Sequence, residues 1–188
     1  MADKNTGKLA VSAWVTLDGV FDAETFGQWF MPYDSPERGE SIRAGVLAAD
    51  AALFGRTTYE MLAPYWSSKT NNEEGIADKL NSMPKYVVSS SLKKADWNNT
   101  TIISDNVVKR VGELKAGRKT LIFGSAELVR SLMEPGLIDE YRLLVQPFVM
   151  GSGKRFFRDD MPMTKLKLVK SKALPHGVNL LWYQPARD

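Results

Sequence analysis

An apolar run that leads directly into a helix pattern holds the residues of this chain best suited to binding chemistry. In Lys119 to Leu132, KTLIFGSAELVRSL, a buried strand is followed by Gly124-Ser125 and then by amphipathic spacing. A helix that begins at the end of a buried strand presents unpaired backbone N–H groups and the positive end of its dipole, and small residues allow a close approach. The junction therefore predicts a site for an anion such as a pyrophosphate.

Two other segments place anion-binding groups after predicted strands. LFGRTTYE, from Leu53 to Glu60, puts Arg56 and two threonines after an apolar strand, and YVVSSSL, from Tyr86 to Leu92, contains three serines. Guanidinium and hydroxyl donors at strand ends suit phosphate groups.

The net charge is only +3 and the basic residues are scattered among acids. A phosphorylated small molecule is therefore expected as ligand, and no nucleic acid or membrane partner is predicted.

Composition excludes several other kinds of chemistry. Cysteine is absent, which rules out disulfides, thiolate metal sites and thiol catalysis. The single histidine, His176, stands in a Pro-His-Gly turn and is expected at the surface, so no metal site is predicted. No window approaches the roughly 20 apolar residues of a membrane-spanning helix, and no signal-peptide pattern is found, so a cytoplasmic location is expected. The 188 residues are expected to form one domain, 1–188.

Strands and helices alternate along the first two-thirds of the chain, which predicts an α/β fold with a mainly parallel sheet covered on both faces. After Met133 the strands follow one another with no helix between them, so this tail is expected to be antiparallel. Ser104 is the predicted N-cap of the helix that starts at 105. The expected strands are 9–15, 51–54, 85–89, 100–103, the TLIF run, 141–150, 165–173 and 179–184. The expected helices are 39–50, 56–62, the later part of 71–83, 105–115 and 125–133.

The candidate binding residues all fall at the carboxyl ends of predicted parallel strands. In an open α/β sheet, ligands bind outside these ends, where the loops converge. We therefore expect the segments to form one cradle for an extended, multiply phosphorylated cofactor. The segments are 16–19, 55–58, 89–91 and 124–126.

At these residues the chain resembles the dihydrofolate reductase-like superfamily, and within it the reductase domain of RibD C-terminal type. The matching segments cover nearly the whole chain in a specific order: VSAWVTLDGV, LFGRTTYEMLAPYW, MPKYVVSSSL, LIFGSAELVRSL, GLIDEYRLLVQPFVMGSGKRFF and the closing hairpin. The resemblance implies a three-layer α/β/α fold, NADPH as cofactor and a homodimer. It also implies hydride transfer to a small planar heterocycle, such as a pteridine, a ribityl-pyrimidine or a flavin-like ring.

The resemblance further implies which residues contact NADPH. Arg56 matches the place of the adenosine 2′-phosphate, which needs positive charge, whereas a 2′-hydroxyl would favour a carboxylate. Folate reductases usually carry two glycines in the pyrophosphate turn; here the second is Ser125, which keeps the backbone N–H and adds a hydroxyl donor. The full expected set is Ala13, Trp14, Leu17 and Gly19 beside the nicotinamide, Gly55, Arg56, Thr57, Thr58, Ser89, Ser90 and Ser91 near the phosphates, and Phe123, Gly124, Ser125 and Ala126 at the turn.

The proton donor and the substrate pocket are less well marked. Asp18, in the loop after the first strand, is the first candidate for the proton donor and Glu40 is the second, while a water would serve equally well. Glu40 lies beside the position of the substrate-binding carboxylate of folate reductases, but the match is poor, so dihydrofolate is not the expected substrate. Aromatic residues are expected to enclose a planar ring together with Trp14: Phe21, Trp29, Phe30, Tyr65 and Trp66.

Each feature also has a simpler structural interpretation. Arg56 could form a surface ion pair, Asp18 could serve only its turn, Gly124-Ser125 could be a tight turn, and the tryptophans could belong to the core. The agreement of the features in order favours function. Two classes stay open: an NADPH-dependent reductase, and a non-catalytic nucleotide-binding or regulatory protein on the same fold. Lys154 and Arg155 are candidates to contact an acidic substrate.

Overall fold

An eight-stranded sheet forms the centre of the molecule, in a computed structural model that describes residues 7–21, 25–158 and 160–186. The strands lie in the order β4-β3-β2-β5-β1-β6-β8-β7. Within the described ranges, no helix is long and apolar enough to cross a bilayer. The strands are β1 (Lys8–Thr16), β2 (Ala51–Gly55), β3 (Lys85–Val88), β4 (Thr100–Ile103), β5 (Lys119–Phe123), β6 (Glu140–Gln146), β7 (Leu166–Ala173) and β8 (Asn179–Pro185). The helices are α1 (Phe26–Trp29), α2 (Pro36–Leu47), α3 (Arg56–Ser67), α4 (Ala77–Ser82), α5 (Val107–Gly117) and α6 (Ala126–Met133), with 3-10 turns η1 (Met31–Tyr33), η2 (Glu73–Gly75) and η3 (Pro175–Gly177).

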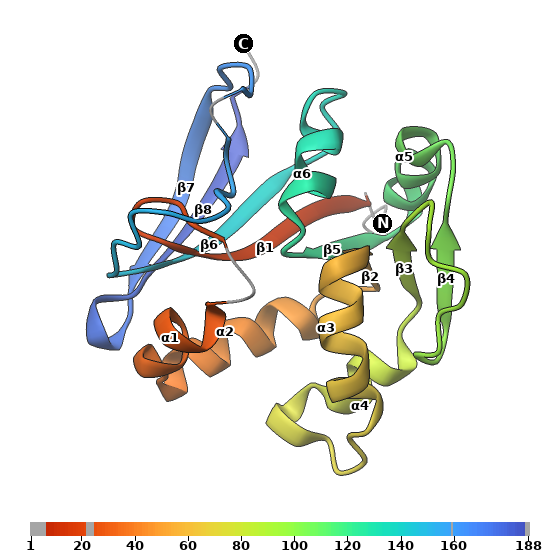
Figure 1. Ribbon diagram of the computed structural model, residues 1–188, viewed down its shortest axis with the longest axis horizontal. Coiled ribbons are helices and arrows are strands. Elements are labelled where there is room, and N and C mark those ends of the chain that lie inside the picture. The colour runs from red at the N-terminus through yellow and green to blue at the C-terminus, as the bar shows by residue number, and fades with distance from the viewer. Residues whose placement is uncertain (1–6, 22–24, 159, 187–188) are drawn as a thin grey trace, which may run out of the picture.

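Helices cover the two faces of the sheet in two groups (Figure 1). α2, α3 and α4 lie on one face, below the sheet in this view, and α5 and α6 lie on the other. The first group connects strands that step from β1 towards β4, and the second connects strands that step back to β6. Crossovers between parallel strands are almost always right-handed, so reversing the direction moves the connecting helix to the opposite face. The reversal falls between β1 and β5, which are parallel neighbours.

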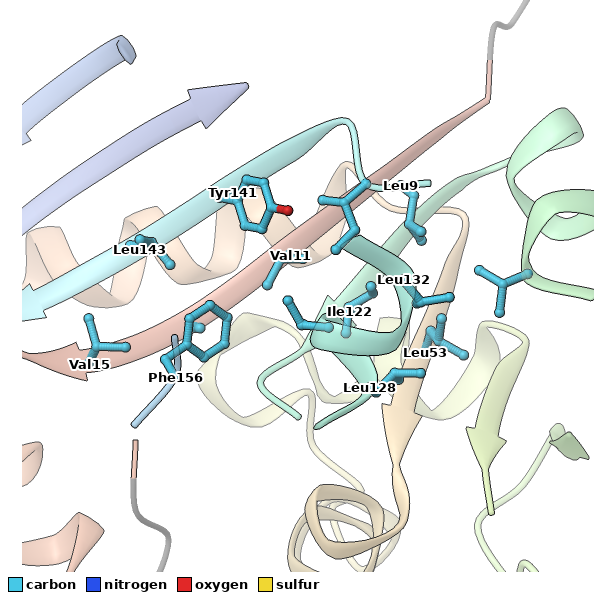
Figure 2. Close-up of a cluster of buried hydrophobic side chains, with 14 of the residues drawn as sticks. Leu9, Val11, Val15, Leu53, Ile122, Leu128, Leu132, Tyr141, Leu143 and Phe156 are labelled. Atoms are coloured by element: carbon cyan, nitrogen blue, oxygen red, sulfur yellow. The ribbon is translucent and has the colours of Figure 1, made fainter. Parts of the chain in front are cut away.

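Each helical layer buries its own apolar cluster against the sheet. Figure 2 shows the cluster under α6, where Leu128 and Leu132 of the helix lie over Val11, Ile122 and Leu53 of three strands. A second cluster fills the space under α2, α3 and α4. The strands β2 and β5 consequently have consecutive buried residues, the pattern of parallel strands covered on both faces. Two-sided burial holds the strand ends in fixed places.

The predicted three-layer α/β/α arrangement is confirmed, with one correction in the tail. β6 pairs in parallel with β1, and only β8 and β7 run antiparallel to their neighbours. The expected antiparallel set wrongly included this strand, because α6 is the crossover that returns β6 to the parallel part of the sheet. β6 also ends at Gln146 instead of continuing to Met150, since the next residue, Pro147, has no N–H for the ladder.

Two helices begin elsewhere than predicted. α2 starts three residues early at Pro36, because Ser35 is its N-cap and accepts a hydrogen bond from the Arg38 N–H at 3.2 Å. A serine followed by proline is a strong start signal for a helix. α5 is preceded by Asn106 in the left-handed conformation, with φ of 46°, and not by a cap at Ser104.

A buried lysine joins the end of α4 to β3. The Nζ of Lys85 donates to the carbonyls of Leu80 at 2.7 Å, Met83 at 2.9 Å and Asn81 at 3.2 Å. A helix end leaves such carbonyls without helical partners, and the Trp97 ring adds a cation–π contact at 4.9 Å. Burial lowers the pKa of Lys85 to about 8, so the amine is still mostly protonated at neutral pH. Lys85 therefore serves as the C-terminal cap of α4.

Replacing Lys85 should destabilise the fold without changing any residue at the carboxyl ends of the parallel strands. Lys85→Met keeps the length of the side chain but leaves three buried carbonyls unpaired, so we expect a loss of about 3 kcal/mol in the free energy of unfolding. Urea denaturation followed by tryptophan fluorescence measures it. Lys93→Met, at an exposed lysine, is the matched control and should change stability by less than about 0.5 kcal/mol. Equal stability of both variants would contradict the capping role.

Candidate functional site

A cavity of about 760 Å³ opens where β1, β5 and β2 end, at the reversal of strand order. Ligand sites of open α/β sheets lie at such places, and the volume suits a small molecule or cofactor. The structure thus brings together three segments that are far apart in the sequence. The predicted site residues that line this cavity are Ala13, Trp14, Phe21, Trp29, Gly55, Arg56, Thr57, Thr58, Phe123, Gly124, Ser125 and Ala126.

The start of α6 lines this cavity and has no side-chain cap. Gly124 and Ser125 both have left-handed backbones, with φ of 52° and 60°, and the Ser125 side chain makes no hydrogen bond to the first turn of its own helix. Successive N–H groups at a left-handed residue followed by a helix form an anion-binding concavity. A Cβ at Gly124 would lie 2.5 Å from the Phe21 ring, so this position has room only for glycine.

The start of α3 is also open. Its N-cap is Gly55, which has no side chain to satisfy the first-turn N–H groups. The Ser125 hydroxyl comes from the neighbouring strand end, accepts from the Gly55 N–H at 2.8 Å, and lies 2.9 Å from the Thr58 Oγ1 and 3.1 Å from the Phe123 carbonyl. The hydroxyl therefore links the two helix starts to each other, and its predicted use as a donor to the ligand stays a prediction. Two helix N-termini without side-chain caps lie side by side.

Basic side chains outnumber acidic ones among the described residues that line the cavity. The two acids, Glu127 and Asp160, pair with Arg158 at 2.9 and 3.3 Å. Arg56 pairs with Glu60 at 3.2 Å, and both side chains are about half exposed. Such an exposed pair contributes little, so the guanidinium can turn to a phosphate. The remaining cations are Lys154 and Arg155, and the cavity as a whole favours an anionic ligand.

An aromatic stack forms one wall of the cavity. Trp14 of β1 stacks on Phe30, with ring centroids 4.3 Å apart and an interplanar angle of 24°. The Arg38 guanidinium also lies over the Phe30 ring, 3.8 Å from its centroid, and donates to the Phe30 carbonyl at 2.6 Å. Trp14 and Trp29 reach the cavity, whereas Phe30 supports Trp14 from behind. A fixed indole of this kind offers a flat, apolar surface to a ring.

The loop after β1 is held by its own carboxylate. Asp18 accepts hydrogen bonds from the Thr16 hydroxyl at 2.6 Å and from the backbone N–H groups of Met150 and Gly151 at 3.1 and 2.9 Å. These donors, the threonine hydroxyl first, lower the pKa of Asp18 to about 2. A carboxylate held ionised in this way is a poor proton donor at neutral pH. Asp18 is thus a loop clamp here, and it does not line the cavity.

The same loop is paired with a distant segment, 148–156. The Leu17 N–H donates to the Phe148 carbonyl at 2.8 Å, the Phe156 N–H donates to Gly19 at 2.9 Å, and Val20 and Arg155 form an antiparallel bridge. Arg155 also donates to the Asp18 carbonyl. Leu17 and Gly19, which were predicted to lie beside the nicotinamide, lie outside the cavity lining. Hydrogen bonds therefore hold the loop after β1 along its length against segment 148–156.

Several other predicted residues lie away from the cavity. Glu40 is exposed on α2, Tyr65 is 47% exposed and donates to Glu74, and Trp66 is buried in the core under α3. The aromatic pocket is therefore smaller than predicted. The serines after β3 do not line it either: Ser89 is buried and accepts from the N–H groups of residues 91 and 92, and Ser90 and Ser91 are exposed.

Some lining residues were not predicted. They are mostly apolar side chains on the inner faces of β1, α2, α3 and β5, where burial alone explains their types, so the sequence carries no separate signal for them. Arg158 and Asp160 follow the phenylalanine pair in the 148–160 segment, and only the spatial pairing of that segment with the loop after β1 brings them close. The set is Ser12, Ile42, Val46, Met61, Leu62, Leu121, Glu127, Leu128, Gly153, Arg158 and Asp160.

Solved structures of known proteins share this architecture. A putative riboflavin biosynthesis protein from Shewanella sp. PV-4 has a TM-score of 0.78 at 18% identity, covering 96% of this chain and 99% of that one. Dihydrofolate reductase from Enterococcus faecalis, complexed with NADP(H) and RAB-propyl, has a TM-score of 0.65 at 14% identity, covering 97% and 98%. The fold is therefore that of the dihydrofolate reductase-like proteins.

The sequence identifies the family within this class. The RibD C-terminal domain matches residues 7–180, and the chain belongs to that family. The protein YyaP of Bacillus subtilis (strain 168), described as uncharacterized, is 29% identical over 173 residues and covers 90% of both chains. The predicted family is thus confirmed.

The clamp role of Asp18 predicts a pH-dependent stability difference. The pKa of about 2 in the folded protein lies below the ordinary value of 3.8, so the stabilisation is complete above pH 3.8 and is lost as the pH falls to 2. Asp18→Asn should lower the free energy of unfolding by about 1 kcal/mol at pH 7, after allowance for solvent screening. Urea denaturation at pH 7 and pH 3 measures the difference in the free energy of unfolding between the variant and the native protein. This difference should be smaller at pH 3. Asp78→Asn, at an exposed carboxylate of α4, is the control, and a gap independent of pH would contradict the clamp.

Proposed function

We propose that this protein is an NADPH-dependent reductase that transfers hydride to a small planar heterocycle of the pteridine, ribityl-pyrimidine or flavin-like kind. The observation that carries the proposal is the meeting of two helix N-termini without side-chain caps at one cavity, beside Arg56 and an aromatic wall. A dinucleotide offers several anionic groups and a flat ring, which match these two parts. The likeness to the Enterococcus faecalis enzyme complexed with NADP(H) supports the choice of cofactor.

The chain's own residues would hold and orient the reactants. The N–H groups at the starts of α3 and α6 would bind the pyrophosphate, and Arg56 would bind the 2′-phosphate. Ala13 and Trp14 would lie beside the nicotinamide, and Trp29 with the apolar side chains of α2 would exclude water from the ring of the substrate. When bound, the cofactor supplies the hydride. Because Asp18 is engaged in its loop and Glu40 lies outside the cavity, water is the proposed source of the proton.

Turnover across a set of acceptors tests the reductase assignment. The native protein at micromolar concentration should bind NADPH and oxidise it, measured as loss of absorbance at about 340 nm, with at least one oxidised pterin, deaminated ribityl-pyrimidine or flavin. Binding of NADPH with no oxidation by any acceptor would favour the alternative, a non-catalytic nucleotide-binding or regulatory protein. No binding of NADPH at millimolar concentration would remove the proposal.

The choice between NADPH and NADH should depend on Arg56. Arg56→Ala removes the cation proposed for the 2′-phosphate, so the dissociation constant for NADPH should rise about 10-fold or more while that for NADH changes little. Isothermal titration of both cofactors measures the two constants. Arg110→Ala, which removes another partly exposed arginine from an ion pair on α5, should leave both unchanged. Equal losses for NADPH and NADH would overturn the role of Arg56.

Homodimerisation and a cytoplasmic location, which were expected from the resemblance and from the sequence, stay predictions for this chain. Size-exclusion chromatography with light scattering measures the oligomeric state directly. A monomer at all concentrations would contradict the first of them.

A further inference from the structure

Ser125 has a backbone conformation that is unfavourable for its residue type. It is the N-cap of α6 with φ of 60° and ψ of 64°, the left-handed region where a Cβ crowds the backbone and glycine is preferred. Its neighbour Gly124 is also left-handed, so a second glycine would relax the turn. Strain of this kind persists where the side chain has a task. A task for the hydroxyl would explain why serine and not glycine occupies this position.

The hydroxyl of Ser125 bridges two elements that begin far apart in the sequence. It accepts from the N–H of Gly55, the N-cap of α3, at 2.8 Å and reaches Thr58 of the first turn of α3 at 2.9 Å. In a capping box the side chain that accepts the N-cap N–H comes from the same helix. Here it comes from the N-cap of another helix. Ser125 is 8% exposed, so these protein contacts, and not solvent, satisfy the hydroxyl.

The fit between the two helix starts is tight as well as hydrogen-bonded. A Cβ on Gly55 would lie 3.0 Å from the Ser125 Oγ and 3.1 Å from its Cβ. The missing side chain at Gly55 thus lets α3 approach α6, and the hydroxyl holds the two at that separation. Neither contact uses the first-turn N–H groups of α6, and the side chain caps neither helix within its own turn.

We propose that Ser125 is a positioning residue that fixes the spacing of the two phosphate-binding helix N-termini. The inference rests on the proposed binding of NADPH and deepens it. A dinucleotide presents its anionic groups at fixed separations, so it gains from both termini only when their spacing matches. Adenosine 2′-monophosphate carries only the phosphate assigned to Arg56, the first residue of α3, so its affinity does not depend on the spacing.

Two variants distinguish the effect of losing the Ser125 hydroxyl from the effect of relieving its backbone strain. Ser125→Ala removes the hydroxyl and keeps the unfavourable conformation, whereas Ser125→Gly removes the hydroxyl and relieves it. Both should raise the dissociation constant for NADPH about 10-fold, because the Gly55 N–H loses its acceptor and the helices lose their link. Both should change the dissociation constant for adenosine 2′-monophosphate by less than about 2-fold. The melting temperature of Ser125→Gly should equal or exceed that of Ser125→Ala.

The matched control is Ser131→Ala, also on α6, whose hydroxyl bonds, among the residues that the structure describes, only to the Leu128 carbonyl of its own helix. Both dissociation constants should stay at the native values. Native affinity for NADPH in the two Ser125 variants would overturn the proposal, and so would an equal loss for both ligands, which indicates a general structural role. A loss in Ser125→Ala that Ser125→Gly restores would also overturn it, because strain and not the hydroxyl would then be the cause. If the native protein binds the monophosphate but not NADPH, the proposed function fails and this proposal fails with it.

Discussion

The reversal of crossover direction between β1 and β5 is the constraint on which the site depends. Right-handed crossovers place the connection after β1 on one face of the sheet and α6, which follows β5, on the other. The two chain directions separate there and leave a hollow between adjacent strand ends. α3 starts one strand further along, so its N-terminus meets that of α6 at the same edge. The proposed binding of anions at this edge therefore depends on the strand order before any single residue is considered.

The sequence predicted this architecture well because buried parallel strands leave an unmistakable pattern. The runs of β2 and β5 are apolar at consecutive positions, and each leads into a small residue, Gly55 or Ser125, that is the N-cap of a helix. Gly55, Arg56 and Gly124 could be assigned to a common edge because the ends of parallel strands share one edge by geometry. The direction of β6 was missed because an isolated strand pattern does not record its pairing partner. Pairing is decided by the crossover before it and not by its own residues.

Side chains whose direction depends on tertiary packing could not be placed from the sequence. Tyr65 and Trp66 lie about one helical turn beyond Met61 and Leu62, which line the cavity, so they are shifted along the helix axis past its end. Tyr65 is exposed there and Trp66 is buried in the core cluster. The Asp-Gly pair at Asp18 gives a turn signal, but two of the three groups that donate to its carboxylate come from residues more than 130 positions away. Lys85 was predicted only as a strand residue, because a strand pattern does not show that the amine turns back to the carbonyls at the end of the preceding helix.

The pairing of the loop after β1 with segment 148–156 has a consequence for how this chain can vary. Main-chain hydrogen bonds and a β-bridge join the two pieces, one from each end of the sequence. A residue inserted into either piece would shift the register of both, so the mouth of the cavity changes shape as a unit. Length differences between relatives in these two stretches should therefore occur together, as compensating pairs, whereas the opposite rim, formed by helix starts, tolerates no such exchange.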